Sequence, residues 1–533
     1  MKVIFVTWGS MSWLWKWVTS ASIWKLIGSS GKRVWMIKMD PYLQVDAGTM
    51  SPYEHWEVFV TDDWAEADLD LGNYERFTWE NLTTDSNITS GKVYLSVINK
   101  ERQWEYLWKT VQIIPHITNE IKDNIIKVAS KYDVTIIEIG GTVWDIESQA
   151  FLEASRQMKK DIGKENILYV HVAPLLYLKY SWELKTKLIQ HSVIKLREYG
   201  LQPDILVCRT EKHINSEIKN KISNFCDVAI ENVIEAVDAK SIYQVPELFK
   251  SQNLDKIIIK SLWLDTIQAD LKSWNTLVER IISPEKEVTI WIIWKYTELE
   301  DTYKSISEAL IHGWVAHNAK VHLNWINSEN LENQDFESIL KTHQKNNKLD
   351  GILVPWWFWE RWVEWKINAV KFARENSVPY LWICLWLQVA VIEFARNMCN
   401  LIESDSTEFN KITNNPVIDY MEEQKHITDK WWTMRLGSYE AILEKWSLAN
   451  TLYEKEIISE RHRHRYEVNP DYHDTLKENW LILSGMSPNR KLVEFIELGN
   501  HPYFIATQAH PEFKSRLESP HPLFSWLIKA SLK

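Results

Sequence analysis

The sequence predicts an α/β protein made of two doubly wound domains. In the first half, short apolar runs typical of buried strands alternate with helical stretches, notably at residues 134–139, 167–172 and 204–208. The same alternation resumes in the second half at residues 288–293, 351–354 and 379–383. Strands that alternate with helices favour mostly parallel sheets, whose ligands bind at the carboxyl ends of the strands.

A polar, helical stretch separates the two halves and ends in the sequence SPEKE at residues 283–287. Such a change in composition is typical of a linker. We therefore expect a first domain at 1–265, a linker at 266–287 and a second domain at 288–533. A chain of 533 residues is long enough for each domain to bury its own core.

Charge and composition exclude several classes of protein. The net charge of −11 argues against a general binder of nucleic acid or of anionic membranes, and the basic stretch RHRHRY at 461–466 is short and isolated. No run of about 18 apolar residues is present, so we expect no membrane-spanning helix. The cysteines have no spacing typical of a metal site or a disulfide framework, which fits a reducing cytoplasm; they are Cys208, Cys226, Cys384 and Cys399.

The stretch from residue 3 to residue 18 resembles a phosphate-binding loop between a strand and a helix. Such a loop needs glycines, because its backbone N–H groups must turn toward the anion without a Cβ in the way. Lys16 is placed to reach the terminal phosphates of a nucleotide. Gly9 is present, but tryptophan stands at the other expected glycine positions: Trp8, Trp13, Trp15 and Trp17.

The whole chain repeats this exchange of glycine for tryptophan. It contains 31 tryptophans and 15 glycines, whereas glycine usually makes up about 7% of a protein. Together the two residue types match a normal glycine content. We therefore hypothesise that most of the tryptophans are glycines in the living protein, as happens when a UGA codon that the host reads as glycine is translated as tryptophan.

Two acidic residues are candidate magnesium ligands in the first domain. Asp70 lies in DLDLGNYERF, and Glu138 lies in the strand that precedes the sequence GG. Lys16 is not followed by Ser or Thr, so the Mg²⁺ of a bound nucleotide needs carboxylates from elsewhere in the chain. The alternative interpretation of each is a solvated acidic turn.

A cysteine in the second domain lies where a nucleophile would. Cys384 follows an apolar strand and precedes a helix, where a helix N-terminus and backbone N–H groups favour a thiolate and an oxyanion. His510 and Glu512 lie two residues apart in QAHPEF, and in an extended segment both would point to one face. His510 is then the base and Glu512 its orienting partner. Taken singly, the cysteine is equally explained as a core residue and the His-Pro pair as a turn.

These motifs make the chain resemble CTP synthase from end to end. The residues from 39 to 77 match the longest signature of that family, and further blocks follow in family order: EIGGTVWDIES, KTKLIQHSV, KNKISNFC, LWICLWLQ, RHRHRYEV and QAHPEF. Where family glycines are replaced, the replacement is tryptophan, as at Trp56, Trp144, Trp182, Trp356, Trp357, Trp359, Trp382, Trp386, Trp431 and Trp432. Leu188 replaces a family proline.

The resemblance implies a ligase whose first domain uses ATP to phosphorylate the 4-oxygen of UTP, after which ammonia displaces the phosphate to give CTP. It implies an ATP site at Trp13, Leu14, Trp15, Lys16, Trp17, Val18 and Asp70, with Mg²⁺ on Asp70 and Glu138. It places UTP, and CTP as feedback inhibitor, at Ser12, Asp145, Ile146, Glu147, Lys185, Thr186, Lys187, Leu188, Ile189, Gln190 and Lys221.

The second domain resembles a class I glutamine amidotransferase with Cys384, His510 and Glu512 as its triad. The resemblance implies L-glutamine binding at Trp357, Leu385, Trp386, Leu387, Gln388, Glu408 and Arg465, with Trp357 at the position of an oxyanion glycine. It also implies passage of ammonia past His55, allosteric activation by GTP near Arg361, and a homotetramer that can stack into filaments.

Two other interpretations stay open at this point. If the tryptophans are literal, the chain is a catalytically inactive, structural paralogue that forms filaments. A different P-loop amidoligase coupled to an amidotransferase is the third interpretation, but it leaves KTKLIQHSV and the long signature after Met39 unexplained.

Overall fold

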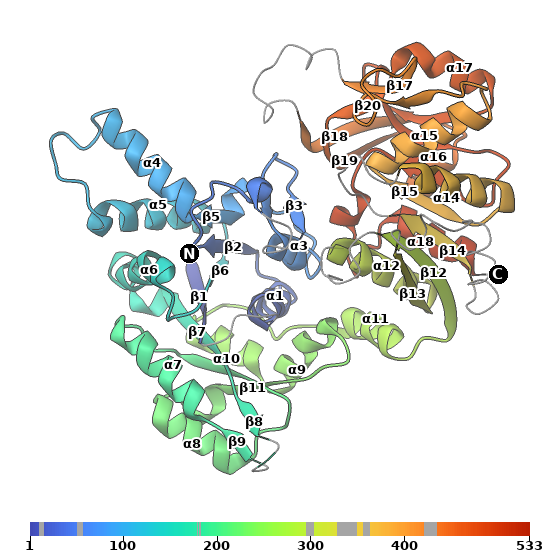
Figure 1. Ribbon diagram of the computed structural model, residues 1–533. Coiled ribbons are helices and arrows are strands. Elements are labelled where there is room, and N and C mark those ends of the chain that lie inside the picture. Colours follow the sequence, from blue (N-terminus) through green and yellow to red (C-terminus); the bar gives the residue numbers. More distant parts are fainter. Residues whose placement is uncertain are drawn as a thin grey trace. The chain divides into compact units, whose positions relative to one another are not determined.

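The computed structural model describes residues 1–9, 15–50, 57–178, 180, 183–294, 303–327, 349–354, 363–420 and 434–532. The chain folds into two compact units (Figure 1). The first contains residues 1–58 and 66–282, and the second contains residues 59–65 and 283–533. No helix within these described ranges is long and apolar enough to cross a membrane.

The first unit is built on a seven-stranded sheet with the order β11-β10-β7-β1-β6-β2-β5. All of its ladders are parallel. Its strands are β1 (Lys2–Trp8), β2 (Val34–Asp40), β5 (Asn87–Thr89), β6 (Val134–Ile139), β7 (Ile167–Pro174), β10 (Ile205–Thr210) and β11 (Val233–Val237). The strands expected at residues 134–139, 167–172 and 204–208 are therefore confirmed as β6, β7 and β10.

Helices cover both faces of this sheet. As a consequence, β1 is buried from Val3 to Trp8. The helices are α1 (Trp15–Gly28), α3 (Leu69–Glu75), α4 (Ser90–Arg102), α5 (Thr118–Ala129), α6 (Gln149–Ile162), α7 (Lys187–Glu198), α8 (Ser216–Cys226), α9 (Val245–Ser251), α10 (Leu254–Ser261) and α11 (Lys272–Ile282). Two short two-stranded sheets are separate from the seven-stranded one. In the first, β3 (Val58–Val60) pairs with β4 (Glu66–Asp68), and in the second, β8 (Leu176–Leu178) pairs with β9 (Glu183–Lys185).

The order of the strands places the end of β1, which precedes the candidate phosphate loop in the sequence, at the centre of the sheet. Strand β1 lies between β6 and β7. The strands β2, β5 and β6 lie on one side of it, and the later strands β7, β10 and β11 lie on the other. Ligands of such sheets bind at the carboxyl ends of the strands where the order reverses. Gly9 follows β1 at that point, and a Cβ there would lie 2.9 Å from the Ser192 side chain of α7. Gly9 therefore lets the loop begin directly against α7.

The second unit has a nine-stranded sheet with the order β13-β12-β14-β15-β23-β22-β21-β18-β19. The ladders from β13 to β23 are parallel, and those from β23 to β19 are antiparallel. The strands are β12 (Lys286–Trp294), β13 (Ala319–Asn327), β14 (Gly351–Val354), β15 (Tyr380–Ile383), β18 (Arg435–Leu443), β19 (Ile457–His464), β21 (Ile482–Met486), β22 (Val493–Glu497) and β23 (Phe504–Thr507). The expected α/β class is confirmed, and the antiparallel half is a feature that strand–helix alternation did not predict.

Six helices and a small three-stranded sheet complete the described part of the second unit. The helices are α12 (Lys304–His317), α14 (Val363–Asn376), α15 (Leu385–Asn397), α16 (Leu448–Tyr453), α17 (His473–Glu478) and α18 (Pro522–Ser531). The small sheet joins β16 (Ser404–Ser406), β17 (Asn415–Tyr420) and β20 (Tyr466–Val468).

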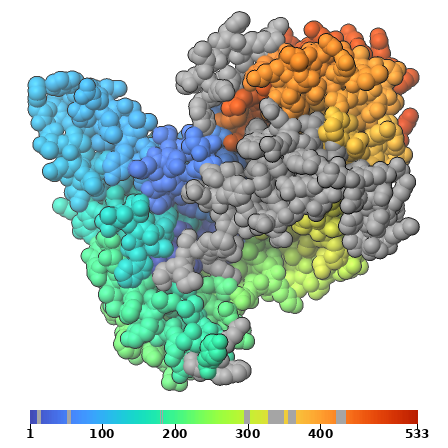
Figure 2. Space-filling view, in the orientation of Figure 1, coloured from blue at the N-terminus to red at the C-terminus, as the bar shows by residue number. Residues whose placement is uncertain are grey.

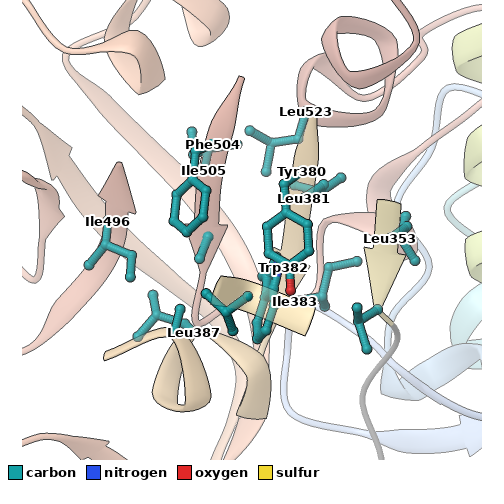
Figure 3. Close-up of a cluster of buried hydrophobic side chains, with 14 of the residues drawn as sticks. Leu353, Tyr380, Leu381, Trp382, Ile383, Leu387, Ile496, Phe504, Ile505 and Leu523 are labelled. Carbon is teal, nitrogen blue, oxygen red and sulfur yellow. The ribbon is translucent and has the colours of Figure 1, made fainter. Parts of the chain in front are cut away.

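The core of the second unit surrounds β15, the strand that leads to Cys384. Tyr380, Leu381, Trp382 and Ile383 are all fully buried. Figure 3 shows them beside Leu353, Ile496, Phe504, Ile505 and Leu523, which come from neighbouring strands and from α18. Strand β15 is therefore packed on both faces, and the residue at its carboxyl end has a fixed position.

In the first unit, Trp274 of α11 anchors its helix. Its indole is 1% exposed and its N–H donates to the Tyr243 carbonyl at 2.7 Å. The Lys25 ammonium lies 4.3 Å from the ring centroid.

We predict that Trp274→Ala lowers the free energy of unfolding of the first unit by about 3–5 kcal/mol, because it removes a buried indole and leaves a cavity. Urea denaturation followed by circular dichroism measures the change. Trp263→Gly is the matched control, since Trp263 is exposed and has a φ of 53°. Equal stability of Trp274→Ala and the parent chain would contradict the prediction.

Candidate active sites

The first candidate site is the turn that holds Cys384 between β15 and α15. Cys384 has a φ of 61° and a ψ of −115°, a conformation that non-glycine residues rarely adopt. Its N–H donates to the Thr507 carbonyl at 2.8 Å, and its carbonyl accepts the Leu387 N–H at 3.0 Å. The strained turn places the sulfur above the first turn of α15, where backbone N–H groups are available to an anion.

The neighbouring strand supplies the other two members of the expected triad. Strand β23 pairs in parallel with β15, so Thr507 lies opposite Ile383 and the chain beyond it reaches the same edge of the sheet. His510 Nδ1 lies 2.8 Å from Glu512 Oε1, and both side chains are fully buried. The segment is not extended as we expected, because Pro511–Lys514 forms a short 3₁₀ helix. The histidine and the carboxylate meet across that turn instead.

The charge state of His510 follows from these partners. Burial opposes the imidazolium, but the Cys384 sulfur and the Glu512 carboxylate outweigh it and raise the pKa of His510 to about 10. His510 therefore carries a proton at neutral pH in the folded protein. Cys384, His510 and Glu512 thus form a charged, water-excluded group, as nucleophilic catalysis by a thiol requires.

Several polar side chains lie near Cys384, and Gln388 in the first turn of α15 is the first of them. Gln388 Nε2 donates to the Tyr466 carbonyl at 2.8 Å, while its buried Oε1 has no hydrogen-bond partner among the described residues. Glu408 and Arg465 lie in the same neighbourhood, since both act electrostatically on the Tyr466 hydroxyl, whose pKa is raised first by burial. Leu385 and Leu387 are buried in α15. Trp357 and the side chain of Trp386 lie outside the described residues.

The second candidate site gathers charge at the carboxyl ends of β2 and β6 in the first unit. Lys16 Nζ donates to the Gly141 carbonyl at 3.3 Å and lies 3.9 Å from Glu138. Burial and the Lys38 ammonium lower the pKa of Lys16, against the opposing effect of Glu138. Glu138 also accepts hydrogen bonds from the Tyr74 and Ser20 hydroxyls at 2.7 and 2.8 Å. Asp70 and Glu138, the expected metal ligands, thus belong to one cluster.

Lys38 is the centre of that cluster, and our sequence reasoning missed it. Its buried ammonium pairs with Asp70 and lies 3.5 Å from Asp40 and 3.4 Å from Glu138. Burial opposes its charge, but these three carboxylates hold the pKa of Lys38 well above its usual value. The sequence feature that could have revealed Lys38 is a lysine near the end of the apolar strand β2, two residues before Asp40.

A protonated carboxyl group lies beside the same cluster. Burial and the Asp70 carboxylate raise the pKa of Asp68 to about 8, although Lys38 acts in the opposite direction. Within the described ranges, no group of three or more His, Cys, Asp and Glu residues is arranged to hold a metal ion. The carboxylates of Asp40, Asp70 and Glu138 all lie close to the Lys38 ammonium.

The remaining expected residues of the first unit lie around the end of β1. Trp17 and Val18 are buried in α1, whereas Ser12, Trp13, Leu14 and the side chain of Trp15 lie outside the described residues, as do His55 and Arg361. Asp145 accepts the Thr142 N–H, and Ile146 and Glu147 follow it in a 3₁₀ turn.

Helix α7 comes close to that turn, because the Lys195 ammonium lies 5.7 Å from the Trp144 ring. Before α7, Lys185 pairs with Glu183, and the Lys221 charge also acts on Glu183. Gln190 donates to the Thr186 hydroxyl at 3.0 Å, Lys187 is exposed, Leu188 is half-buried and Ile189 is fully buried. The structure thus brings the lysines of this motif to one end of α7.

The interaction between His510 and Glu512 makes the stability of the second unit depend on pH. An unfolded histidine titrates near pH 6.5, so the stabilising contribution of the raised pKa is complete below that pH and is lost as the pH rises through about 10. We predict that Glu512→Gln costs about 1.5–3 kcal/mol at pH 6 and less at pH 10. Scanning calorimetry at both pH values measures the difference, and a pH-independent difference would contradict the prediction.

Comparison with known proteins assigns both units to one family. The family profile described as CTP synthase N-terminus matches residues 2–264, and the profile described as glutamine amidotransferase class-I matches residues 298–530. The CTP synthase of Methanocaldococcus jannaschii is 57% identical over 532 residues, which cover 100% of this chain and 98% of that protein. The CTP synthase of Carboxydothermus hydrogenoformans is 53% identical over 534 residues, with coverage of 100% and 99%.

Among solved structures, the glutaminase domain of the Trypanosoma brucei CTPS with bound acivicin is 33% identical, with a TM-score of 0.43 and coverage of 46% of this chain and 93% of that one. The full-length similarity to the two curated relatives runs through both units, in the same order as the two profiles. The chain therefore belongs to the CTP synthase family.

Proposed function

We propose that this protein makes CTP from UTP, using ATP to activate the pyrimidine and L-glutamine to supply ammonia. The observation that carries the proposal is the coexistence, in one full-length member of the family, of a buried Cys384–His510–Glu512 group and a separate lysine–carboxylate cluster around Lys38. The first group suits release of ammonia from an amide, and the second suits binding of phosphates. The protein is a ligase that forms a C–N bond in pyrimidine nucleotide biosynthesis.

In the amidotransferase unit, the Cys384 sulfur attacks the side-chain carbonyl carbon of glutamine. His510 carries a proton at neutral pH and donates it to the departing nitrogen, so that ammonia leaves and a thioester remains. Water then attacks the thioester carbonyl and His510 accepts the proton of that water. The bond between the Cys384 sulfur and the acyl carbon breaks, and glutamate is released. Glu512 keeps the imidazole oriented through its 2.8 Å contact with Nδ1.

Glutamine recognition rests on the groups around Gln388. We assign the α-carboxylate of glutamine to Arg465, whose guanidinium can form charge-assisted hydrogen bonds. Glu408 is suited to the α-ammonium group, because it is an anion close to the same Tyr466. We assign Leu385, Trp386, Leu387 and Gln388 to contact with the bound glutamine, and the oxyanion position to Trp357.

In the synthase unit, Lys16 and Lys38 are the cations that would hold the phosphates of ATP. Asp70 and Glu138 fit a magnesium ion, since both carboxylates already converge on one cation, the Lys38 ammonium. Mg²⁺ typically takes one or two carboxylates together with substrate phosphates. When bound, the ion neutralises phosphate charge during transfer to the 4-oxygen of UTP. Movement of Lys38 toward the phosphates would free both carboxylates.

The binding of UTP and CTP is assigned to the residues at the end of β1 and the start of α7. A triphosphate requires several cations, and Lys185, Lys187 and Lys221 supply them. Asp145, Ile146 and Glu147 lie in the turn close to α7 and are assigned to the product CTP as a feedback inhibitor. Ser12 completes the UTP site.

An exposed apolar surface supports assembly of several copies. Residues from α4 to the start of α5 leave large side chains in solvent: Leu95, Ile98, Leu107, Ile113 and Ile114. In Figure 2 this light-blue part forms a projecting edge of the first unit. Exposed apolar patches of this kind mark interaction sites, and we assign this one to a homotetramer that can stack into filaments. Activation by GTP and a cytoplasmic location belong to the same proposal.

The structure also bears on the hypothesis that most tryptophans are glycines. Among the tryptophans that the structure describes, five have a positive φ, between 53° and 75°: Trp64, Trp104, Trp108, Trp263 and Trp480. All five side chains are at least 60% exposed, so their indoles contribute little burial. For a bulky residue a positive φ is a genuine outlier, whereas glycine adopts it without penalty. This geometry supports glycine at these positions and disfavours the inactive, structural paralogue.

Trp274 has the opposite character. Its indole is buried, its N–H is bonded to Tyr243, and its ring packs with its centroid 5.5 Å from that of Phe77. A glycine here would leave a large cavity and an unsatisfied carbonyl group. We therefore assign Trp274 as a genuine tryptophan.

We predict UGA codons at Trp64, Trp104, Trp108, Trp263 and Trp480, and a UGG codon at Trp274. Gene sequencing reads the codons, and the intact mass of protein purified from the native host shows which residue is incorporated. UGG at the five positive-φ positions would overturn the hypothesis, and UGA at Trp274 would overturn the assignment of that residue.

We predict that Cys384→Ser lowers glutamine-dependent CTP formation by at least a thousandfold and leaves ammonia-dependent CTP formation within about twofold, because only the nucleophile is removed. CTP is measured by chromatography with glutamine or ammonium chloride as the nitrogen source. Cys399→Ser is the matched control, since Cys399 lies beyond the far end of α15 from Cys384 and its thiol donates to the Thr475 carbonyl at 3.9 Å. Loss of both activities in Cys384→Ser, with intact folding, would contradict the proposed division of labour.

A further inference from the structure

Seven residues from the first half of the sequence belong to the second unit. The segment Phe59–Ala65, which we name the inserted segment, groups with residues 283–533 rather than with its own neighbours along the chain. Its Asp62 carbonyl accepts the Ser438 N–H at 3.1 Å. Gly437 has a φ of 88°, and a Cβ there would lie 2.9 Å from the Trp64 nitrogen. The inserted segment is thus seated closely on β18.

The Asp62 side chain neutralises a fully buried arginine of β19. Asp62 Oδ1 accepts a hydrogen bond from Arg461 Nε at 2.7 Å and lies 3.5 Å from Lys514 Nζ. Arg461 is 0% exposed. A second Arg461 nitrogen donates to the Phe513 carbonyl at 3.4 Å. Removal of one partner from a buried charged pair leaves the other uncompensated, so the position of Arg461 depends on Asp62.

Two further contacts lead from this pair to His510. The Arg461 carbonyl accepts the His510 N–H at 2.7 Å. The Phe513 ring stacks on the His510 imidazole, with a centroid separation of 5.2 Å and an interplanar angle of 15°.

The Phe513 ring also packs against Phe59 in a T-shaped arrangement, with the ring centroids 5.2 Å apart. The Arg461 guanidinium lies 5.0 Å from the Phe59 ring centroid. The backbone and the ring of His510 are therefore both held by residues that contact the inserted segment.

We propose that Asp62 and Phe59 are positioning residues for His510, so that release of ammonia depends on a segment supplied by the synthase half of the sequence. The proposal rests on the proposed function of His510 in glutamine hydrolysis. The inserted segment continues through β4 into α3, which carries Asp70. The segment that supports Arg461 and Phe513 is therefore joined along the chain to the helix that carries Asp70.

The test compares Asp62→Asn with Asp63→Asn in the full-length protein. Asp63 is exposed and accepts the Thr61 hydroxyl at 2.7 Å, so its replacement removes the same charge from the inserted segment but keeps the Asp62 carboxylate that accepts the Arg461 Nε hydrogen bond. We expect Asp62→Asn to lower the kcat of glutamine hydrolysis at least tenfold, since small displacements of a reacting group have large effects on rate. The KM for glutamine should stay within about twofold, because Gln388 and Tyr466 are untouched. Ammonia-dependent CTP formation and Asp63→Asn should match the parent protein.

Two more variants separate positioning from a loss of structure. Asp62→Glu keeps the carboxylate and should recover most of the lost kcat. Phe59→Leu keeps an apolar contact but removes the edge of the ring, and it should again lower kcat rather than raise KM.

An unchanged kcat in Asp62→Asn and Phe59→Leu, in a parent protein that hydrolyses glutamine, would overturn the proposal, as would a rise in KM without a fall in kcat. A parent protein that forms CTP from ammonia but does not hydrolyse glutamine would contradict the proposed function itself.

Discussion

The parallel pairing of β15 with β23 is the constraint on which the amidotransferase site depends. The register that places Ile383 opposite Thr507 brings two segments separated by more than a hundred residues to one edge of the sheet. The hydrogen bond from the Cys384 N–H to the Thr507 carbonyl then ties the nucleophile to the strand that leads to His510. A one-residue slip would turn the side chains of β23 to the other face of the sheet. The buried aromatic and aliphatic residues around β15 prevent such a slip.

In the synthase unit, the main constraint is that several carboxylates lie close together with little solvent around them. Its strand ends collect Asp40, Asp70 and Glu138 in a region with little solvent, where carboxylates alone would repel one another. The Lys38 ammonium balances them, while burial and then the Asp70 carboxylate raise the pKa of the neighbouring Asp68. A nucleotide with its metal ion brings both signs of charge. In this cluster the Lys38 ammonium is the cation that Asp40, Asp70 and Glu138 share.

Patterns among residues that are neighbours in the sequence predicted individual strands and turns. The strands β6 and β14, the strand–cysteine–helix turn at Cys384 and the apolar strand before Lys16 all follow from runs of residues that are neighbours in the sequence. The contribution of Lys38 could not be predicted in that way, because its partners come from β2, β6 and α3 and meet only through the sheet order. The antiparallel half of the second sheet and the turn at Pro511–Lys514 also depend on long-range packing.

The place of Phe59–Ala65 also affects how the C-terminal half behaves by itself. A recombinant fragment that begins at the linker, near Ser283, would lack these seven residues although they belong to its fold. Solvent would then reach β18 beside Gly437, where the inserted segment packs in the intact chain. The guanidinium of Arg461 would also lose the Asp62 carboxylate. Excision at the apparent boundary therefore removes part of the support of the very histidine that such a fragment is meant to retain.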